Sequence, residues 1–404
     1  MRTAAPRGVR YYGGGGFSGY DQAALAYVRA LVNAGVPVQW IPLDWTSERM
    51  QASSWIQPDG RRRLLEQCGT YGNFADLPAL VERTADPVAH DIVIAHAPPE
   101  FWPFAFETGK RNIGCTVWEA DRAPAHWLPL MRQAERVIVP GEFNRQTFLR
   151  SGLDRPIAVV PHIRRHRWCE FPPSAVASAR ARLGIAHGHR VLYTINAWNP
   201  RKNLPNTIRA FAHAFASGDP VTLLIKTGAH GHAGAPFYSS LPTRELTVQA
   251  MAAAAAETGR PLPRIVLHDA QLDGDSIDMI HAIGDIYLSL THGEGWGLGA
   301  FEAATLGKPV VMTAWGGQCE FLGADWPGAV PYMLESVPLW PPLRPSYFPS
   351  QRWAVPDVDV AAKLLRQIVT EPESALVVAR TIRERIVREY AEPVVINALL
   401  EAIA

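Results

Sequence analysis

Two glutamates eight residues apart, in a glycine-rich stretch, are the residues of this sequence best placed to bind a sugar. Residues 290–310 read LTHGEGWGLGAFEAATLGKPV, with Glu294 in a glycine-interleaved loop and Glu302 on the helix predicted after it. This spacing lets one carboxylate meet a sugar while the other bonds a ribose further along the same ligand. Backbone N–H groups of the loop can reach phosphate or sugar oxygens; they belong to Gly295, Trp296, Gly297 and Leu298. The alternative is that both glutamates are helix caps or surface carboxylates.

Two adjacent cations, Arg201 and Lys202, lie in NAWNPRKNL (residues 196–204), between a predicted strand and a predicted helix. Positive charge at a helix start is opposed by the helix dipole, and a bound anion would relieve that conflict. A diphosphate is the natural candidate, because two cations and backbone N–H groups can neutralise it without a metal ion. Asn196 opens this loop and Lys226 ends a neighbouring strand, so both are expected beside the ligand. A solvated basic turn is the alternative.

A glycine-rich loop, GGGGFSGY at residues 13–20, follows the first predicted strand. Glycines permit close backbone approach to a phosphate or sugar, and the next helix adds a positive dipole end. The expected ligand contacts are Gly15, Gly16, Ser18 and Gly19. The alternative is a flexible turn that binds nothing.

Two further candidates follow strands of the first half. His96 ends the strand in DIVIAHAPPE, where it is expected to open onto a ligand site, although a loop histidine with a structural partner is an equal alternative. Glu119 follows the strand in TVWEADRAPAHW, where a carboxylate suits hydroxyl binding or general-base work. Glu119 could instead cap a helix near Ala123 and pair with Arg122.

Strands and helices alternate along the chain in two successive runs, which predicts an α/β protein with two doubly wound, Rossmann-like domains facing across a cleft. The break between the runs is the charged, proline-containing segment 164–175. We therefore expect domains at residues 1–168 and 169–373. Residues 374–404 are expected to form one helix that packs back on the first domain. Residues 44–90 are expected to form loops or short helices, and residues 324–358 an extended excursion.

The composition excludes several classes of protein. The 404 residues carry a formal net charge of +1, which argues against nucleic-acid binding. We find no apolar run long enough to span a membrane and no secretory signal, so we expect a cytoplasmic protein. The four cysteines are scattered and predict neither a zinc site nor a disulfide framework.

Several segments resemble the retaining glycosyltransferases of family four, which have the GT-B fold, and a bacterial subgroup of them. EGWGLGAFEAATLGKPVV resembles the family's two-glutamate signature, and NPRKNL resembles its diphosphate-binding loop. The segments TVWEADRAPAHW, VIVPGEFNRQTFLRSG and IAVVPH resemble its first domain, and WAVPDVDVAAKLL resembles a tail segment of the subgroup. The resemblance covers most of residues 8–400.

The resemblance implies transfer of a sugar from a nucleoside diphosphate donor to an acceptor hydroxyl, with retained anomeric configuration and without a bound metal. The first domain would hold the acceptor and the second the donor. Glu294, Arg201, Lys202, His96 and Glu119 would then be the catalytic group. Two Asp-x-Asp sequences, at residues 273–275 and 357–359, each open a predicted helix, where an N-cap explains them.

The expected partners are a nucleoside diphosphate sugar and a glycan, lipid-linked or protein acceptor, with at most transient contact at the inner face of a membrane. The expected process is bacterial polysaccharide or glycoconjugate synthesis. Three alternatives stay open: a non-catalytic nucleotide-sugar binding partner, and a nucleotide-sugar epimerase or a sugar phosphorylase on the same scaffold. A dinucleotide oxidoreductase is disfavoured, because no acidic residue closes the second predicted strand.

Overall fold

The computed structural model describes residues 8–15, 18–46, 49–52, 76–165, 167–231, 240–323, 325–338 and 346–404. The chain divides into two compact units. The first comprises Met1–Trp118, Arg122–Arg164 and Arg388–Ala404, and the second comprises Glu119–Asp121 and Arg165–Val387. The division thus falls at the start of the charged segment 164–175. The second unit also includes three residues of the loop that follows β5 of the first.

The first unit is built on a seven-stranded sheet with the order β3-β2-β1-β4-β5-β6-β7. Every neighbouring pair is parallel except β2 and β3, which are antiparallel. The strands are β1 (Val9–Gly14), β2 (Val38–Thr46), β3 (Arg49–Ala52), β4 (Ile92–His96), β5 (Arg111–Cys115), β6 (Arg136–Val139) and β7 (Ile157–Val159). All five residues of β4 are buried, as expected of a central parallel strand that is covered on both faces.

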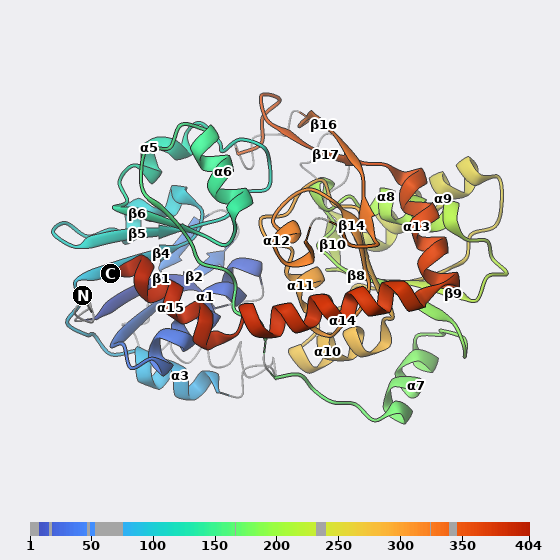
Figure 1. Cartoon of the computed structure of the whole chain (residues 1–404), viewed down its shortest axis with the longest axis horizontal. Helices are drawn as coiled ribbons and strands as arrows, with labels where there is room; N and C mark the ends of the chain where they lie inside the picture. The colour runs from blue at the N-terminus through green and yellow to red at the C-terminus, as the bar shows by residue number, and fades with distance from the viewer. Residues whose placement is uncertain are drawn as a thin grey trace. The chain divides into compact units, whose positions relative to one another are not determined.

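Helices of the first unit follow the strands and cover the sheet (Figure 1). They are α1 (Gly19–Asn33), α3 (Leu77–Thr84), α4 (Trp102–Ala105), α5 (Trp127–Met131), α6 (Glu142–Arg150) and α15 (Glu392–Ile403), with a 3-10 turn η2 (Pro99–Phe101). A capping box starts α1: the Ser18 hydroxyl accepts from Asp21 N, and Asp21 Oδ2 accepts from Ser18 N. Helix α15 lies beside α1 and buries Val395, Leu399 and Ile403 in the same core.

The second unit is built on a six-stranded, all-parallel sheet with the order β12-β9-β8-β13-β14-β15. Its strands are β8 (Arg190–Ile195), β9 (Val221–Lys226), β12 (Arg264–His268), β13 (Ile286–Ser289), β14 (Val310–Thr313) and β15 (Ala329–Val330). All six residues of β9 are buried. Two small antiparallel pairs accompany this sheet, β10 (His230–Gly231) with β11 (Leu241–Pro242), and β16 (Tyr332–Ser336) with β17 (Arg352–Pro356).

Helices that lie wholly in the second unit include α7 (Pro173–Arg182), α8 (Leu204–Ala214), α9 (Thr243–Thr258), α10 (Gly274–Ile283), α11 (Leu298–Thr305), α12 (Gln318–Leu322) and α13 (Val358–Thr370), with a 3-10 turn η3 (Pro200–Lys202). Helices α8, α9 and α13 pack on the sheet and share one core with it. Side chains of Asp273 and Asp357 cap α10 and α13, accepting from Ser276 N and Val360 N. The N-cap explanation of both Asp-x-Asp sequences is therefore confirmed.

The expectation of a single helix over residues 374–404 is wrong. Helix α14 (Pro372–Glu389) ends at Glu389, and α15 begins at Glu392 after a two-residue break. Pro393 explains the break, because a proline lacks the N–H that would bond to the carbonyl four residues earlier and its ring clashes with that carbonyl. Helix α14 belongs to the second unit as far as Val387. The chain from Arg388 onward, which includes α15, belongs to the first unit.

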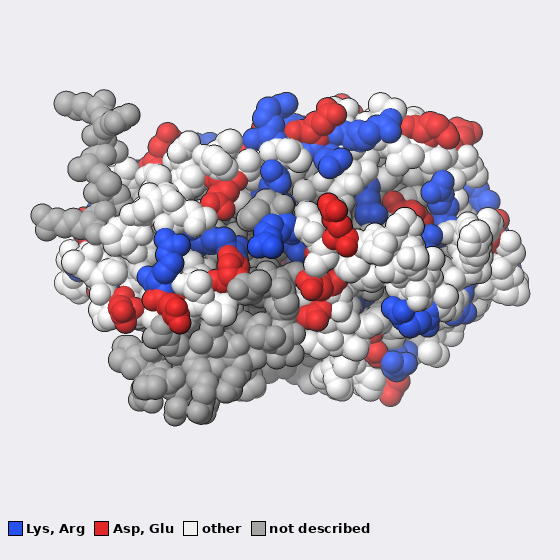
Figure 2. Space-filling model, turned by 90° about the horizontal axis from the view of Figure 1, so that it is seen from below, with Lys and Arg blue, Asp and Glu red and all other residues white. Residues whose placement is uncertain are grey.

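Charges of both signs are interspersed on the face shown in Figure 2, where lysines and arginines alternate with aspartates and glutamates. That distribution agrees with the formal net charge of +1. The face in Figure 2 therefore lacks, among the described residues, the single-sign field that attracts nucleic acid.

Candidate functional site

The segment that carries Arg201 and Lys202 has a defined conformation at the carboxyl end of β8. The Asn199 side chain accepts a hydrogen bond from Lys202 N at 2.9 Å and so caps the short turn η3. Asn203 follows with φ 52°, a left-handed conformation that asparagine tolerates better than most residues, and it starts α8. The two cations therefore project from a fixed turn.

Glu294 meets both cations. Strand β13 is paired in parallel with β8, so the loops after the two strands leave the same edge of the sheet. Lys202 Nζ lies 2.7 and 2.8 Å from the two carboxylate oxygens of Glu294. Arg201 Nη1 donates to Glu294 Oε2 at 3.2 Å and to the carbonyl oxygen of Gly293 at 2.7 Å. Residues that lie far apart in the sequence thus form one compact cluster at this edge of the sheet.

Glu119 and Tyr347 complete this cluster. Arg201 Nη2 lies 3.3 Å from Glu119 Oε1, and the Tyr347 hydroxyl donates to Glu119 Oε2 at 3.0 Å. A side chain at Gly293 would collide with the carbonyl oxygen of Glu119, so the glycine permits this approach. The alternative that Glu119 caps a helix and pairs with Arg122 is wrong, since its carboxylate bonds Arg201 and Tyr347 and the helix that follows, α5, begins at Trp127.

Burial and charge act in opposite directions on these groups. Burial disfavours the charged form of Arg201, but the Glu119 and Glu294 carboxylates outweigh it and raise its pKa. For Lys202, burial and the nearby Arg201 outweigh Glu294 and lower its pKa. Burial disfavours the charged form of Glu294, yet Lys202 and Arg201 hold its pKa below the ordinary value. The cluster therefore holds two cations against two carboxylates in a site shielded from water.

Glu302 lies on α11 with partners of its own. Glu302 Oε2 is 3.3 Å from His281 Nε2, and Glu302 Oε1 is 3.5 Å from Arg165 Nη1. Burial raises the pKa of Glu302, but the His281 hydrogen bond and Arg165 outweigh it and leave the pKa lowered. The carboxylate is thus held charged, with its side chain 23% exposed.

Asn196 and Lys226 are buried at the carboxyl ends of β8 and β9. Asn196 Nδ2 donates to Thr194 Oγ1 and Ser289 Oγ at 2.8 and 3.1 Å, which joins the ends of β8 and β13. Lys226 Nζ donates to the carbonyl oxygen of Thr227 at 2.6 Å, and burial lowers the pKa of this lysine. Register pairs Lys226 with Ile195 at the end of β8. Their contact with a ligand stays a prediction.

The glycine-rich loop after β13 combines a tryptophan of the core with backbone positions predicted to contact a ligand. Trp296 is 3% exposed and packs against Phe301 and Phe321, with ring centroids 5.3 and 5.4 Å apart, so its side chain belongs to the core. Gly297, with φ 89°, occupies the N-cap of α11 in a conformation that glycine adopts at little cost. Gly295 and Leu298 flank these two residues, and ligand contact through their backbone stays a prediction.

His96 does not open onto a ligand site, and that expectation is wrong. Its side chain is 2% exposed and its Nδ1 lies 2.7 Å from the Tyr11 hydroxyl. The rings of Tyr20 and Tyr27 also pack against it, with centroids 5.9 and 5.7 Å away. Burial, helped by the nearby His162, lowers the pKa of His96 to about 3. The end of β4 is therefore covered by Tyr11, Tyr20 and Tyr27.

The first glycine-rich loop is described in part. Gly15 follows β1 and is buried, whereas Gly16 lies outside the described residues. Ser18 and Gly19 are exposed at the start of α1, where the Ser18 hydroxyl has its capping role. Contact of this loop with a ligand stays a prediction.

Among the described residues, then, the structure brings Glu119, Arg201, Lys202 and Glu294 together, and Glu302 forms a separate group with Arg165 and His281. The sequence analysis did not find Tyr347, Arg165, Asp278 or His281. Tyr347 stands 228 residues from its partner Glu119 in the sequence, so no local pattern relates the two. No group of three or more histidine, cysteine, aspartate or glutamate side chains in the described part of the chain is arranged to hold a metal ion.

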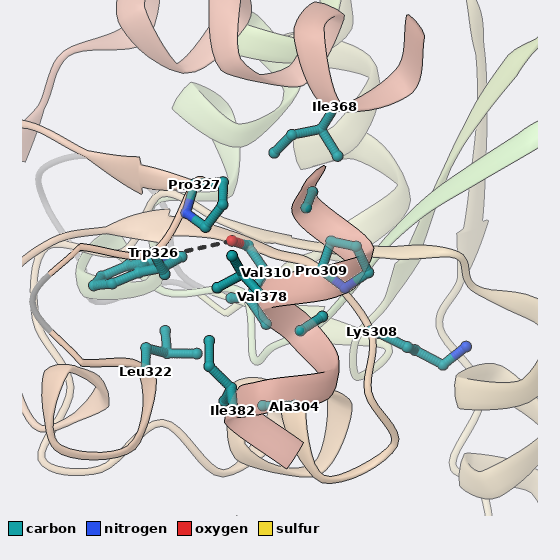
Figure 3. A pocket seen from close by; sticks show the side chains of 13 residues that line it. Ala304, Lys308, Pro309, Val310, Leu322, Trp326, Pro327, Ile368, Val378 and Ile382 are labelled. Carbon is teal, nitrogen blue, oxygen red and sulfur yellow. Dashed lines mark hydrogen bonds between the residues drawn. The ribbon is translucent and has the colours of Figure 1, made fainter. Parts of the chain in front are cut away.

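A small cavity of the second unit has a different character (Figure 3). Its volume is about 10 Å³, and Figure 3 shows aliphatic side chains turned into it from α13, α14 and β14. Trp326 Nε1 donates to the carbonyl oxygen of Val310 at 3.0 Å along one wall. The lining contains one charged residue, Lys308, whose Nζ donates to the carbonyl oxygen of Gly284. Such a lining suits packing rather than sugar chemistry.

No protein-family model matches the sequence, and no curated protein is significantly similar to it. Solved structures do match. HepE of Anabaena, in complex with UDP and glucose, has a TM-score of 0.64 at 14% identity over 98% of each chain. Sucrose-phosphate synthase from Thermosynechococcus elongatus has a TM-score of 0.63 at 15% identity over 98% of each chain. A glycosyltransferase from Rickettsia africae has a TM-score of 0.60 at 13% identity, covering 97% of this chain and 96% of its own.

The chain has the GT-B fold. The two doubly wound α/β units predicted from the alternation of strands and helices are thereby confirmed. Identities of 12–15% establish the architecture alone, so the chemistry rests on the residues of this chain. No helix among the described residues is long and apolar enough to cross a membrane.

Proposed function

We propose that this chain is a retaining glycosyltransferase of family four, which moves a sugar from a nucleoside diphosphate donor to an acceptor hydroxyl. One observation carries the proposal: Arg201 and Lys202 project together from the carboxyl end of β8 and meet a carboxylate from the loop after β13. The GT-B fold supports it, because HepE, which shares that fold, was solved with UDP and glucose. A UDP-sugar is therefore the first donor to test.

In this proposal Arg201 and Lys202 hold the diphosphate and neutralise the charge that builds on it as the glycosidic bond breaks. Two buried cations are worth more there than in water, because the effective dielectric constant is lower. We propose that they perform this task without a bound metal ion. Lys226 and Asn196 would lie beside the same phosphates.

The two glutamates would divide the rest of the donor between them. Glu294 would accept from hydroxyls of the transferred sugar, and Glu302 from hydroxyls of the ribose. The backbone of Gly295, Trp296, Gly297 and Leu298 would wrap the sugar and phosphates. Gly15, Gly16, Ser18 and Gly19 would be further ligand contacts.

Retention of configuration requires the acceptor hydroxyl to attack from the face that the phosphate leaves. A phosphate oxygen can then take the proton, so the reaction needs no strong enzymic base. Glu119 would orient the acceptor hydroxyl, since its carboxylate is fixed by Arg201 and Tyr347. His96 has no part in this scheme, because Tyr11, Tyr20 and Tyr27 enclose its ring.

We propose that the first unit holds the acceptor and the second the donor, and that the acceptor is a glycan, lipid-linked or protein hydroxyl used in bacterial polysaccharide or glycoconjugate synthesis. Mixed charges on the face in Figure 2 support at most transient membrane contact there. We propose a cytoplasmic site of action.

The decisive experiment is release of free nucleoside diphosphate from a panel of UDP-, GDP- and ADP-sugars, with and without simple glycoside acceptors. Release of nucleoside diphosphate with a new glycoside as product supports transfer. NMR of that product should show the anomeric configuration of the donor, and an inverted centre would refute the retaining mechanism. Binding without release from any donor would favour a non-catalytic binding partner.

A further inference from the structure

Arg165, the first residue of the long second segment of unit two, is bound between two carboxylates. Its Nη1 lies 2.8 Å from Asp278 Oδ1 and 3.5 Å from Glu302 Oε1, and its Nη2 donates to Asp278 Oδ2 at 3.0 Å. Asp278 is 3% exposed, so it is a buried anchor on α10. One hydrogen bond and one close ion-pair contact thus hold the guanidinium group against the Asp278 carboxylate.

The residues after Arg165 hold it in this position. The Trp168 ring lies against the guanidinium, with the Arg165 Cζ 4.2 Å from the ring centroid. The backbone N–H of Cys169 donates to Asp278 Oδ2 at 2.9 Å. Arg165 is therefore fixed by its own chain segment as well as by α10.

His281 holds the other oxygen of Glu302 from the next turn of α10. Its Nε2 is 3.3 Å from Glu302 Oε2, and its Nδ1 is 2.9 Å from the Tyr193 hydroxyl. His281 is fully buried, so Tyr193 fixes the orientation of its ring. Each oxygen of the Glu302 carboxylate thus has one partner, and the carboxylate has one orientation.

The carboxylate still has capacity for a ligand. Two oxygens offer about four lone-pair sites, of which Arg165 and His281 occupy two. One guanidinium charge faces two carboxylates, Asp278 and Glu302, so Glu302 keeps negative charge for a donor to approach. A carboxylate that is charged, oriented and partly exposed is suited to a pair of neighbouring hydroxyls.

We propose that Arg165 is a positioning residue for nucleotide binding, which aims the Glu302 carboxylate at the ribose hydroxyls and links ribose recognition to the segment that joins the two units. This rests on the proposed function, in which Glu302 meets the ribose. Arg165 touches Glu302 and acts through it.

The test compares nucleotides that differ by one ribose hydroxyl. Affinities of UDP, GDP and ADP and of their 2′-deoxy counterparts are measured by calorimetry for the wild type, Arg165→Gln and Arg165→Lys. A hydrogen bond from a hydroxyl to a charged group corresponds to about tenfold or more in affinity, so the wild type should prefer the ribose form of its nucleotide by that factor. Arg165→Gln should reduce the preference to below about threefold and leave the 2′-deoxy affinity almost unchanged, since only the ribose contact is lost.

Arg165→Lys keeps the charge but has one nitrogen in place of the two Nη atoms, so its preference for the ribose form should be intermediate. This variant tests the proposal if Arg165→Gln does not fold. Arg180→Gln is the matched control. Arg180 also pairs with an aspartate, Asp285, at 3.1 Å, and its side chain is 25% exposed against 24% for Arg165. This control should keep the full preference for ribose.

The outcomes separate the two proposals. A folded Arg165→Gln or Arg165→Lys variant with the wild-type preference overturns the positioning role and leaves the proposed function standing. An equal loss of affinity for ribose and deoxyribose forms overturns it too, because that pattern means general damage to the site. A wild type that binds none of the three nucleoside diphosphates overturns the proposed function itself.

Discussion

The Nζ atom of Lys202 lies 2.7 and 2.8 Å from the two carboxylate oxygens of Glu294. The cation proposed to hold the diphosphate and the carboxylate proposed to hold the sugar therefore neutralise each other directly. A diphosphate must compete with Glu294 for Lys202, and the sugar hydroxyls must give Glu294 new partners. The pair thus couples binding of the two halves of a donor.

Replacing Lys202 with alanine should lower turnover by about 10²-fold or more, the scale seen when one preorganised charge-stabilising donor is removed. The reason is that Arg201 alone would then face the leaving diphosphate, while Glu294 would keep its negative charge beside it. The measurement is the rate of nucleoside diphosphate release at saturating donor. Lys308→Ala is the control, because Lys308 is a largely buried lysine of the same unit that bonds the Gly284 carbonyl. Normal turnover in Lys202→Ala would contradict the assignment.

Replacing Glu294 with glutamine should change binding and turnover in opposite directions. The substitution removes a negative charge that competes with phosphate for Lys202, so UDP should bind about tenfold more tightly. Turnover should fall about ten- to a hundredfold, because the transferred sugar loses a charged acceptor for its hydroxyls. Calorimetry with UDP and donor turnover measure the two effects.

Glu302→Gln is the matched comparison for Glu294→Gln, since it makes the same chemical change eight residues further along. Glu302 pairs with Arg165 and His281 and lies outside the cluster of Lys202. We therefore expect UDP to bind more weakly to Glu302→Gln, the opposite sign. If both variants weakened UDP binding, Glu294 would not be a competitor for Lys202.

Much of the architecture could be predicted because local sequence patterns indicate strands and helices. The run VTLLIK reads as a buried strand, and all six of its residues are buried in β9. Residues 142–150, EFNRQTFLR, read as a helix from the sequence alone, and α6 has these same bounds. Aspartates three residues before a backbone N–H that needs a partner, such as Asp273, were recognised as caps. Each of these patterns spans only a few neighbouring residues, so it can be recognised from the sequence alone.

The parts that could not be predicted depend on which distant segments meet. His96 ends a strand, as several ligand residues do, but it lies on a central strand under three tyrosines, which no local pattern reveals. Tyr347 bonds Glu119 across 228 residues of sequence. The pairing of Arg165 with Glu302 likewise depends on how α10 and α11 pack. Reactive residues at strand ends could be predicted from the sequence, but the residues that contact them could not.

The hydrogen bond from Trp326 to the Val310 carbonyl should contribute measurably to the stability of the second unit. Trp326→Phe removes the indole N–H from a buried acceptor, so the free energy of unfolding should fall by about 1–3 kcal/mol. Ile382→Val, which trims another wall of the cavity in Figure 3, should cost about 0.5–1.5 kcal/mol. Urea unfolding measures both, and UDP affinity should not change in either. A Trp326→Phe variant that unfolds with the wild-type free energy would contradict a role of the hydrogen bond.

His96 should make the protein less stable as the pH falls below neutrality. Burial lowers the pKa of His96 to about 3, while the histidine of the unfolded chain titrates near its ordinary pKa of 6.5. Between these pH values the unfolded state binds a proton at His96 and the native state does not. The contribution of His96 to the free energy of unfolding is therefore present above pH 6.5 and is lost on acidification. The groups that face the ring are Tyr11, Tyr20, Tyr27 and His162.

The comparison of wild type with His96→Gln isolates this effect, because glutamine can still bond the Tyr11 hydroxyl but does not titrate. Between pH 7 and pH 5 the free energy of unfolding of the wild type should fall by about 2 kcal/mol more than that of the variant. His162 has a pKa lowered to about 3 by burial and titrates in both proteins, so its contribution cancels in the difference. Urea unfolding at the two pH values measures it. Equal losses in the two proteins would mean that His96 is protonated in the native state, and therefore that its ring is accessible to water.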